Sequence, residues 1–310
     1  MRRSRERRLK LAHYVRRGDT RVGIVRGDEI FDLAEAAGKS GVSELSQTDS
    51  IDSILERGVL EKAIRAEEKL TKAASGVPLR STRLRPPILS PEKILLVAVN
   101  YLSHGKETNV APPPYPHFFT KFTNTLIGPD DTILLPKVSQ KVDWEVELAV
   151  VIGRTGKYIK KQRAFDHVAG YTISNDISFR DFQLPPGWPE KVSPLGLNWV
   201  KGKGLDYSFP LGPWLVTRDE IGDPHDLEIS LAVNGQTRQR SRTSDMVFKS
   251  DALIEYISAG ITLRPGDIIS TGTPLGVALA TGVPFLKDGD VVEGRIEKIG
   301  TLRNHAKRET

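Results

Sequence analysis

Short runs of β-branched residues, bounded by Gly, Pro and Asp, recur through the last two thirds of the chain. Such runs predict strands rather than helices. No regular alternation of strands with long helices is present, and neither a GxGxxG motif nor a P-loop occurs, which disfavours the nucleotide-binding α/β folds. The Asn234-Gly235 pair predicts a tight hairpin, and one amphipathic helix is expected at about residues 250–259. We therefore predict a mainly β, α+β fold, with strands at residues 94–99, 145–152, 168–175, 227–233, 268–270 and 291–299.

A second pattern fills the first 88 residues. Residues 9–34 alternate apolar and polar side chains around turn signals, which predicts a short β-meander. Helical periodicity follows at residues 50–57 and 60–70, and four prolines between Pro78 and Pro91 then suggest a linker. We predict a small α+β N-terminal domain at residues 9–88 and a larger domain at residues 89–310.

The net charge of +6 is confined to the start of the chain. The whole sequence has 45 basic and 39 acidic residues, of which residues 1–30 hold ten and four, leaving 35 of each sign. This distribution predicts a basic, solvated and disordered arm at residues 1–8, with a polyanion-binding arm as the alternative. We expect no nucleic-acid partner for the folded part of the chain.

The absence of cysteine and of long apolar runs excludes further classes of protein. With no cysteine, disulfides, thiolate metal sites and cysteine nucleophiles are excluded, and a cytoplasmic location is the simplest expectation. The longest strongly apolar stretch, residues 94–99, is far shorter than the roughly 20 residues of a membrane span. No signal peptide and no membrane partner are predicted.

Paired carboxylates open one of the predicted strands, in the sequence Asp143-Trp-Glu145-Val-Glu147. Because strand side chains alternate between faces, Glu145 and Glu147 point the same way, about 7 Å apart. Asp176 ends the predicted strand at 168–175 and could supply a third ligand. Such carboxylates repel one another unless a cation lies between them, and hard divalent cations prefer oxygen ligands. An exposed edge strand and a simple turn are the alternatives.

A histidine and a glutamate follow the strand at 94–99. In a helical turn, His104 and Glu107 lie three residues apart, so the carboxylate can orient the imidazole as a general base. The Ala-Pro-Pro-Pro sequence after them must be extended, and the segment could form a mobile lid. A surface contact between the two side chains is the alternative.

Several polar side chains lie in contexts that suit an anionic ligand. Lys121 is set among apolar residues, Lys203 lies between glycines, and Thr273 belongs to a Thr-Gly-Thr-Pro loop after a predicted strand. Arg180 and Gln183 follow the third acid closely and could face the same pocket. A snorkelling lysine, a solvated loop and a plain turn are the alternatives.

Together, and in this order, these segments resemble the fumarylacetoacetate hydrolase superfamily over about residues 90–305. The resemblance is to its longer members, of the acylpyruvate hydrolase or 2-hydroxyhepta-2,4-diene-1,7-dioate isomerase type. The matching pieces are NYLSHGKE (100–107), TKFTNTLIGPDDTI (120–133), DWEVELAVVIG (143–153), SNDISFRDFQ (174–183), KGKGLD (201–206), LRPGDIISTGTPLGV (263–277) and GDVVEGRIEKIGTLRN (289–304).

The resemblance implies a mixed β-roll or barrel as the catalytic domain, and a homodimer. It implies Mg²⁺, or Mn²⁺ or Ca²⁺, on Glu145, Glu147 and Asp176. It further implies a water-activating His104/Glu107 dyad on a lid and a catalytic Lys121. Contacts to a small 2-oxo acid substrate or its surroundings are implied for Tyr101, Arg180, Gln183, Lys203 and Thr273. Two departures stand out: Gly204 replaces the usual Ser or Thr, and the insertion at residues 184–196 is long.

The reaction implied by the resemblance is hydrolysis of a C–C bond in an acylpyruvate-like 2,4-dioxo acid. A divalent metal and a lysine would stabilise the enolate formed as the bond breaks. The same enolate serves decarboxylation of oxaloacetate, or isomerisation of 2-hydroxydienoic and 2-oxo diacids in aromatic catabolism. A non-catalytic metal-binding relative is a further alternative.

Overall fold

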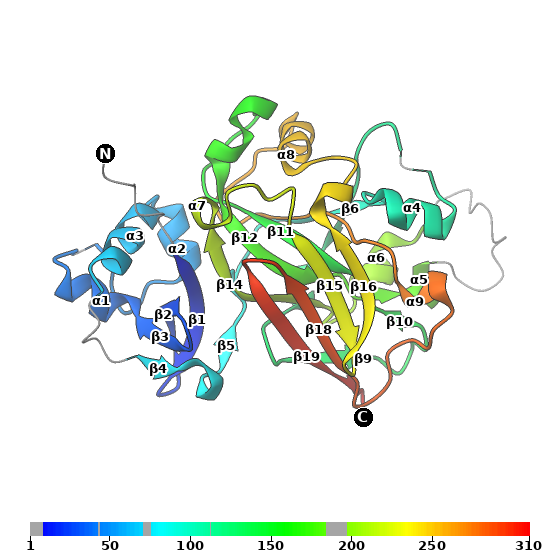
Figure 1. The fold of residues 1–310 in the computed structure, drawn as a ribbon, viewed down its shortest axis with the longest axis horizontal. Coiled ribbons are helices and arrows are strands. Elements are labelled where there is room, and N and C mark those ends of the chain that lie inside the picture. Colours follow the sequence, from blue (N-terminus) through cyan, green and yellow to red (C-terminus); the bar gives the residue numbers. More distant parts are fainter. Residues whose placement is uncertain (1–8, 43, 71–75, 112, 184–196) are drawn as a thin grey trace.

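The computed structural model describes residues 9–42, 44–70, 76–111, 113–183 and 197–310. The predicted arm at residues 1–8 and the insertion at residues 184–196 lie outside the described residues. The described chain forms three β-sheets, with short helices around them (Figure 1). The helices are α1 Leu33–Lys39, α2 Ile51–Glu56, α3 Leu60–Glu68, α4 Leu102–Thr108, α5 Arg180–Gln183, α6 Trp199–Lys203, α7 Arg218–Ile221, α8 Ser250–Ser258 and α9 Ala278–Thr281.

A large mixed sheet runs through the molecule. Its strand order is β4-β3-β2-β1-β14-β12-β11-β17-β6-β7, with β5 beside β1 and β8 beside β14. The central strands β11 and β12 are buried along their whole length. The strands are β1 Lys10–Arg16, β2 Asp19–Arg26, β3 Glu29–Asp32, β4 Val77–Pro78, β5 Leu84–Arg85, β6 Ile94–Ala98, β7 His117–Lys121, β8 Leu126–Ile127, β11 Val146–Ile152, β12 Val168–Asn175, β14 Phe209–Thr217 and β17 Ile268–Ser270.

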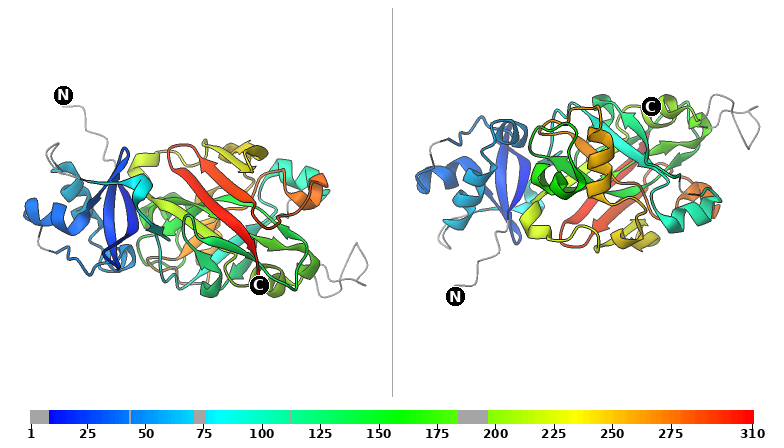
Figure 2. Two further views of the ribbon diagram at one scale, coloured as in Figure 1. Left: turned by 90° about the horizontal axis from the view of Figure 1, so that it is seen from below. Right: turned by 90° about the horizontal axis from the view of Figure 1, so that it is seen from above.

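A second sheet packs against β11 and β12. Its strand order is β16-β15-β18-β19-β9, and Figure 2 shows its red strands β18 and β19 crossing the green strands of the large sheet. Gly294 of β18 approaches closely, because a Cβ there would lie 3.0 Å from Val146 Cγ2. Its strands are β9 Thr132–Leu135, β15 Glu228–Val233, β16 Gln236–Arg242, β18 Val291–Ile296 and β19 Gly300–Arg308; β10 Val142–Asp143 and β13 Ser178–Phe179 pair separately.

The N-terminal segment shares both its sheet and its core with the rest of the chain. The predicted meander is present as β1, β2 and β3, and α2 begins with a capping box at Ser50. However, β1 pairs with β14, and one hydrophobic cluster joins β1, α1, α2 and α3 to β11 and β14. The domain boundary near residue 88 stays a prediction, and hydrogen bonding between strands continues across it.

Most predicted elements are present within one or two residues of the expected ends. The strand at 168–175 is β12, the amphipathic helix is α8, and Asn234-Gly235 joins β15 to β16 with positive φ at both residues. Strand β14 was not predicted, because Pro210, Gly212 and Pro213 interrupt its apolar pattern. In the large sheet, β14 is a central strand that lies between β1 and β12.

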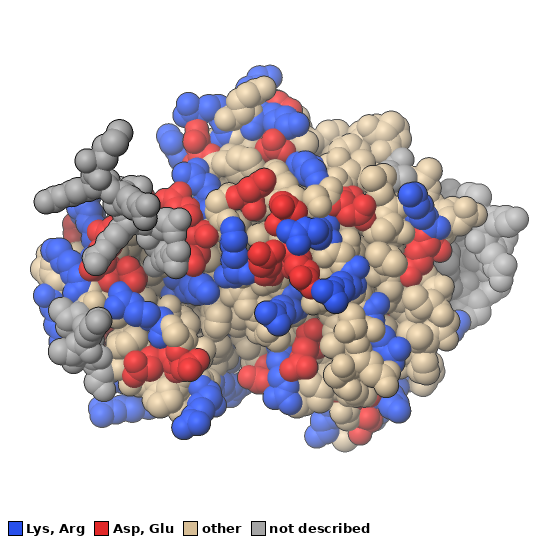
Figure 3. Space-filling model, viewed as in Figure 1, with Lys and Arg blue, Asp and Glu red and all other residues tan. Residues whose placement is uncertain are grey.

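Charged side chains of both signs cover the visible face of the second sheet (Figure 3). Arg240 pairs with Glu228 at 3.0 Å and Arg303 with Glu293 at 3.7 Å. Within the described ranges, none of the helices combines the length and apolar character needed to cross a membrane.

Candidate active site

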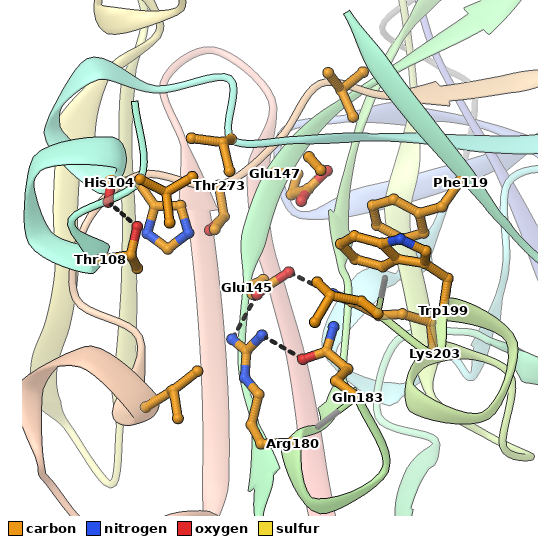
Figure 4. Close-up of a pocket in the computed structure, with 16 residues that line it drawn as sticks. His104, Thr108, Phe119, Glu145, Glu147, Arg180, Gln183, Trp199, Lys203 and Thr273 are labelled. Carbon is orange, nitrogen blue, oxygen red and sulfur yellow. Dashed lines mark hydrogen bonds and ion pairs between the residues drawn. The ribbon is translucent and has the colours of Figure 1, made fainter. Parts of the chain in front are cut away.

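A cavity of about 350 Å³ opens at the end of the large sheet where β6, β11 and β17 meet the helices α4, α5 and α6. Figure 4 shows His104 on one side and Phe119, Trp199 and Lys203 on the other, with Glu145 and Glu147 between them. Its lining combines charged and polar side chains around the carboxylates with apolar side chains such as Val97, Phe119 and Trp199. The lining residues are Val97, Ala98, Val99, His104, Thr108, Val110, Phe119, Glu145, Glu147, Arg180, Gln183, Leu197, Trp199, Lys203, Thr273 and Leu279.

The three predicted carboxylates converge at the base of this cavity. Strands β11 and β12 are antiparallel with Glu147 opposite Ser174, so the start of β11 lies beside the end of β12. Glu145, Glu147 and Asp176 are all buried, and each offers an oxygen within 4.8 Å of the others. The backbone joins them too, since the Asp176 N–H donates to the Glu145 carbonyl at 2.9 Å.

Lys203 lies directly between two of the acids. Its Nζ donates to Glu145 Oε2 at 2.7 Å, to Asp176 Oδ2 at 2.5 Å and to Ser178 Oγ at 2.6 Å. Burial disfavours its charge, but the carboxylates of Asp176 and Glu145 raise the pKa of Lys203 above its ordinary value. The ammonium group therefore occupies a position where two acids attract a cation.

Arg180 and Lys121 complete the positive charge around the acids. Arg180 Nη2 donates to Glu145 Oε1 at 2.6 Å, and Lys121 Nζ lies 3.1 Å from Asp176 Oδ1. Burial lowers the pKa of Lys121 to about 8, although Asp176 opposes the shift. Burial also opposes ionisation of Glu145, yet Lys203 and Arg180 hold the pKa of Glu145 well below its ordinary value.

The carboxylate charge of Glu147 is less compensated by nearby cations than the charges of Glu145 and Asp176. Burial, together with the negative charges of Asp176 and Glu145, raises the pKa of Glu147 well above its ordinary value. Within the described ranges, the donors to Glu147 are neutral: Ser270 Oγ at 2.5 Å and the Gly272 N–H at 2.9 Å. Asp176 Oδ1 has no partner with hydrogen-bond geometry among the described residues. Three converging carboxylates, of which Glu147 has no ion pair in the part of the chain that the structure describes, fit a hard divalent cation such as Mg²⁺, Mn²⁺ or Ca²⁺.

The histidine and glutamate pair lies on α4, as the predicted helical turn requires. His104 Nδ1 is 3.4 Å from Glu107 Oε2, and both Glu107 oxygens accept from the Gly276 N–H, at 2.9 and 3.0 Å. His104 lines the cavity, whereas Glu107 lies behind it. The loop after β17 thus fixes the carboxylate that orients the imidazole.

The remaining predicted residues divide between the cavity and the core. Gln183 and Thr273 line the cavity; Gln183 Oε1 accepts from Arg180 Nη1 at 2.9 Å, and Thr273 Oγ1 donates to the Val146 carbonyl at 3.0 Å. Tyr101 is fully buried in the core and is not among the residues that line the cavity, and its predicted contact with the substrate or its surroundings stays a prediction.

Sequence reasoning missed a buried aspartate and an aromatic wall. Asp143 Oδ2 accepts from Arg180 Nε at 2.9 Å, and its two oxygens accept from the N–H groups of Ala278 and Leu279. Its alternation with Glu145 and Glu147 was the available signal. Phe119 and Trp199 stack 4.5 Å apart at the apolar side of the cavity. This ring stacking connects β7 to α6, and no local pattern in the sequence predicts it.

The family model described as "Fumarylacetoacetate (FAA) hydrolase C-terminal" matches residues 93–307. The chain belongs to the fumarylacetoacetate hydrolase family. It is an enzyme of this family, as the sequence resemblance predicted, and the predicted mainly β fold is confirmed.

Similar proteins within the family carry different activities in their names. Oxaloacetate tautomerase FAHD2A, mitochondrial, of Bos taurus is 47% identical over 229 residues, covering 74% of this chain and 70% of that protein. The solved fumarylacetoacetate hydrolase of Exiguobacterium antarcticum is 31% identical with a TM-score of 0.78, covering 97% of this chain and all of that one. Maleylpyruvate hydrolase of Sphingobium sp. SYK-6, solved with manganese(II) and pyruvate, is 31% identical with a TM-score of 0.76 and the same coverage.

Proposed function

We propose that this family member is a divalent-metal-dependent tautomerase of a small 2-oxo diacid of the oxaloacetate type. The observation that carries the proposal is His104, oriented by Glu107 and facing the same cavity as the carboxylates and Lys203. The name of the Bos taurus relative supports this choice over hydrolysis, the reaction first implied by the sequence. Oxaloacetate was the substrate of a predicted alternative, and tautomerisation uses the same enolate.

The reaction moves one proton between the carbon beside the oxo group and the oxo oxygen. A divalent cation held by Glu145, Glu147 and Asp176 would polarise the oxo group and stabilise negative charge on its oxygen. In our proposal His104 exchanges the proton at carbon, and Glu107 stabilises the imidazolium while the Gly276 N–H keeps Glu107 in place. The charges of Lys203 and Arg180 attract the substrate carboxylates.

Hydrolysis of an acylpyruvate is the second candidate. It is favoured by the likeness to maleylpyruvate hydrolase, whose solved structure holds manganese(II) and pyruvate. The same dyad could activate water, and the wall of Phe119 and Trp199 suits an apolar acyl group. Isomerisation of a hydroxydienoic diacid needs only the proton transfer already described.

The experiment follows the decay of enol-oxaloacetate, and the cleavage of acetylpyruvate and maleylpyruvate, with the full chain and Mn²⁺ or Mg²⁺. We expect tautomerisation to dominate, and His104→Ala to lower its rate by about 10²–10⁴-fold. Lys106→Ala is the matched control, since Lys106 is exposed on the same helix. Mn²⁺ binding should survive His104→Ala.

Cleavage of either acylpyruvate without tautomerisation above the spontaneous rate would replace this proposal by the second candidate. Metal binding without turnover of any of the three substrates would support a non-catalytic relative. The homodimer, the cytoplasmic location and the lack of nucleic-acid and membrane partners stay predictions.

A further inference from the structure

A second cavity, of about 410 Å³, lies between β5 and the segments around β8, β9 and Tyr207. It shares no lining residue with the candidate active site. In Figure 1, β5 lies at the junction between the N-terminal strands and the rest of the molecule. The lining residues are Arg83, Arg85, Leu126, Ile127, Asp131, Thr132, Leu134 and Tyr207.

Arg85 is the unusual residue of this cavity. It is half-buried on β5, opposite His13 of β1, and its Nε is buried without a hydrogen-bond partner. Among the described residues, no carboxylate pairs with its guanidinium group. An arginine cannot lose its proton, so a buried Nε–H without an acceptor is costly unless a ligand oxygen accepts from it.

Arg83 adds to the positive charge of the cavity. Both arginines line the cavity, Arg85 from β5 and Arg83 from the residues just before it. Arg83 Nη2 lies 3.2 Å from Asp131 Oδ1, but the Arg83 side chain is 65% exposed, and such a pair is weak. The other oxygen of Asp131 accepts from the Gly128 N–H at 2.9 Å. Two guanidinium groups therefore face one carboxylate.

The rest of the lining limits the size and character of a ligand. Leu126, Ile127 and Leu134 supply apolar surface, and Thr132 and Tyr207, both exposed, also line the cavity. The cavity suits a small molecule with one anionic group and a short carbon skeleton. Guanidinium groups bind carboxylate and phosphate through the same planar fork.

We propose that Arg85, assisted by Arg83, binds a small carboxylate or phosphate metabolite at this second site. The site is independent of the proposed tautomerase reaction. This second site nevertheless adjoins a segment that contacts Lys121, because Tyr207 precedes Ser208, whose hydroxyl accepts from Lys121 Nζ at 3.3 Å.

The test is calorimetric titration of the full, metal-free chain with inorganic phosphate and, separately, with succinate. We expect saturable binding of at least one probe, weakened about tenfold or more in Arg85→Met. Methionine keeps much of the apolar stem and removes the charge. The matched control is Arg163→Met, because Arg163 is 73% exposed and far in sequence from the cavity. Tighter binding of phosphate indicates a phosphorylated ligand, and tighter binding of succinate a carboxylate.

Three results would overturn the proposal. The first is no binding of either probe to the wild-type chain, and the second is equal binding to Arg85→Met. The third is dissociation of an oligomer by Arg85→Met, in sedimentation velocity, without any anion binding to the wild type; Arg85 would then pair with a second copy of the chain. Thermal unfolding of each variant verifies that the chain is folded.

Discussion

Lys203 lies closer to the acids than its sequence context indicates. The predicted contact with the substrate or its surroundings stays a prediction, and Lys203 Nζ bonds to Glu145 and Asp176, two of the predicted metal ligands. The carboxylates themselves were predictable, because alternation along one strand places Glu145 and Glu147 on one face. The lysine between them was not, since α6 reaches the site through tertiary packing and no spacing rule relates it to β11.

This position predicts that Lys203→Met makes the protein depend on a divalent cation for its stability. Removing one member of a buried ion pair leaves uncompensated charge and costs about 3–5 kcal/mol. Added Mn²⁺ should restore much of that stability by neutralising the same oxygens. The expected result is a lower melting temperature than wild type without metal, and a larger rise on adding Mn²⁺.

Lys201→Met provides the matched control for this prediction. Lys201 lies on the same helix but is exposed, with its Nζ 5.2 Å from the centre of the Phe182 ring. It should melt close to wild type and respond to Mn²⁺ as wild type does. Equal metal responses of the two variants would show that Lys203 does not share oxygens with the bound cation.

At the scale of elements, the loop after β17 positions the dyad through one glycine. Gly276 has φ of +103°, and a Cβ there would lie 2.0 Å from the Arg238 carbonyl oxygen. Gly276→Ala should therefore displace the loop, lower stability by at least about 2 kcal/mol and slow turnover through the loss of its bonds to Glu107. Gly282→Ala is the control, since that glycine has φ of +69° but open space around it. Urea unfolding and turnover measured together test this; a Gly276→Ala enzyme with wild-type turnover would contradict the role given to the loop.

A buried histidine links β1 to α2 and to the segment after β5. His13 Nδ1 lies 2.9 Å from the Pro86 carbonyl, and Nε2 accepts from the Ile51 N–H at 2.9 Å. Burial lowers the pKa of His13, although Pro86 and Asp52 oppose the shift and Arg85 adds to it. The folded chain therefore favours the neutral imidazole of His13 over the protonated one.

The sign of this shift predicts a loss of stability in mild acid. The unfolded chain protonates His13 near its ordinary pKa of about 6.5, whereas the folded chain resists. The contribution of His13 to the free energy of unfolding is complete above that pH and is lost as the pH falls toward the pKa of His13 in the folded chain. Between pH 7.5 and 5.5 the loss is up to about 1.4 kcal/mol. Urea unfolding at both pH values should show a smaller loss in His13→Gln than in wild type or in the exposed-site control His117→Gln. Identical losses in all three proteins would rule His13 out as the source.

Elements with a clean pattern were predicted well, and β14 shows why others were not. An uninterrupted apolar run predicted the ends of β12 correctly, and the Asn234-Gly235 pair predicted the hairpin between β15 and β16. In β14, prolines and a glycine argue against a central strand. The strand forms because β8, β12 and β1 offer partners along different parts of it, which is information about distant residues.

At the scale of the whole molecule, residues 9–88 are expected to be indispensable. Deleting residues 9–88 would remove β1 from β14 and expose buried side chains such as Leu211, Leu215 and Val151. We predict that the shortened chain is insoluble or lacks a cooperative thermal transition. Deletion of residues 1–8 alone should leave unfolding and metal-dependent turnover intact. A soluble, active chain beginning at residue 89 would instead support two separable domains.

The pairing of Lys10 with Val216 also has a consequence for the order of events during synthesis. At about 5–20 residues per second, the ribosome needs roughly 10–40 s to make residues 17–208, which separate β1 from β14. For that interval one edge of the first meander has no native partner in β14, and contacts between such distant residues close slowly. Until β14 has been made, the open edge of β1 can pair with a strand of another molecule, so correct folding depends on β14 reaching that edge first.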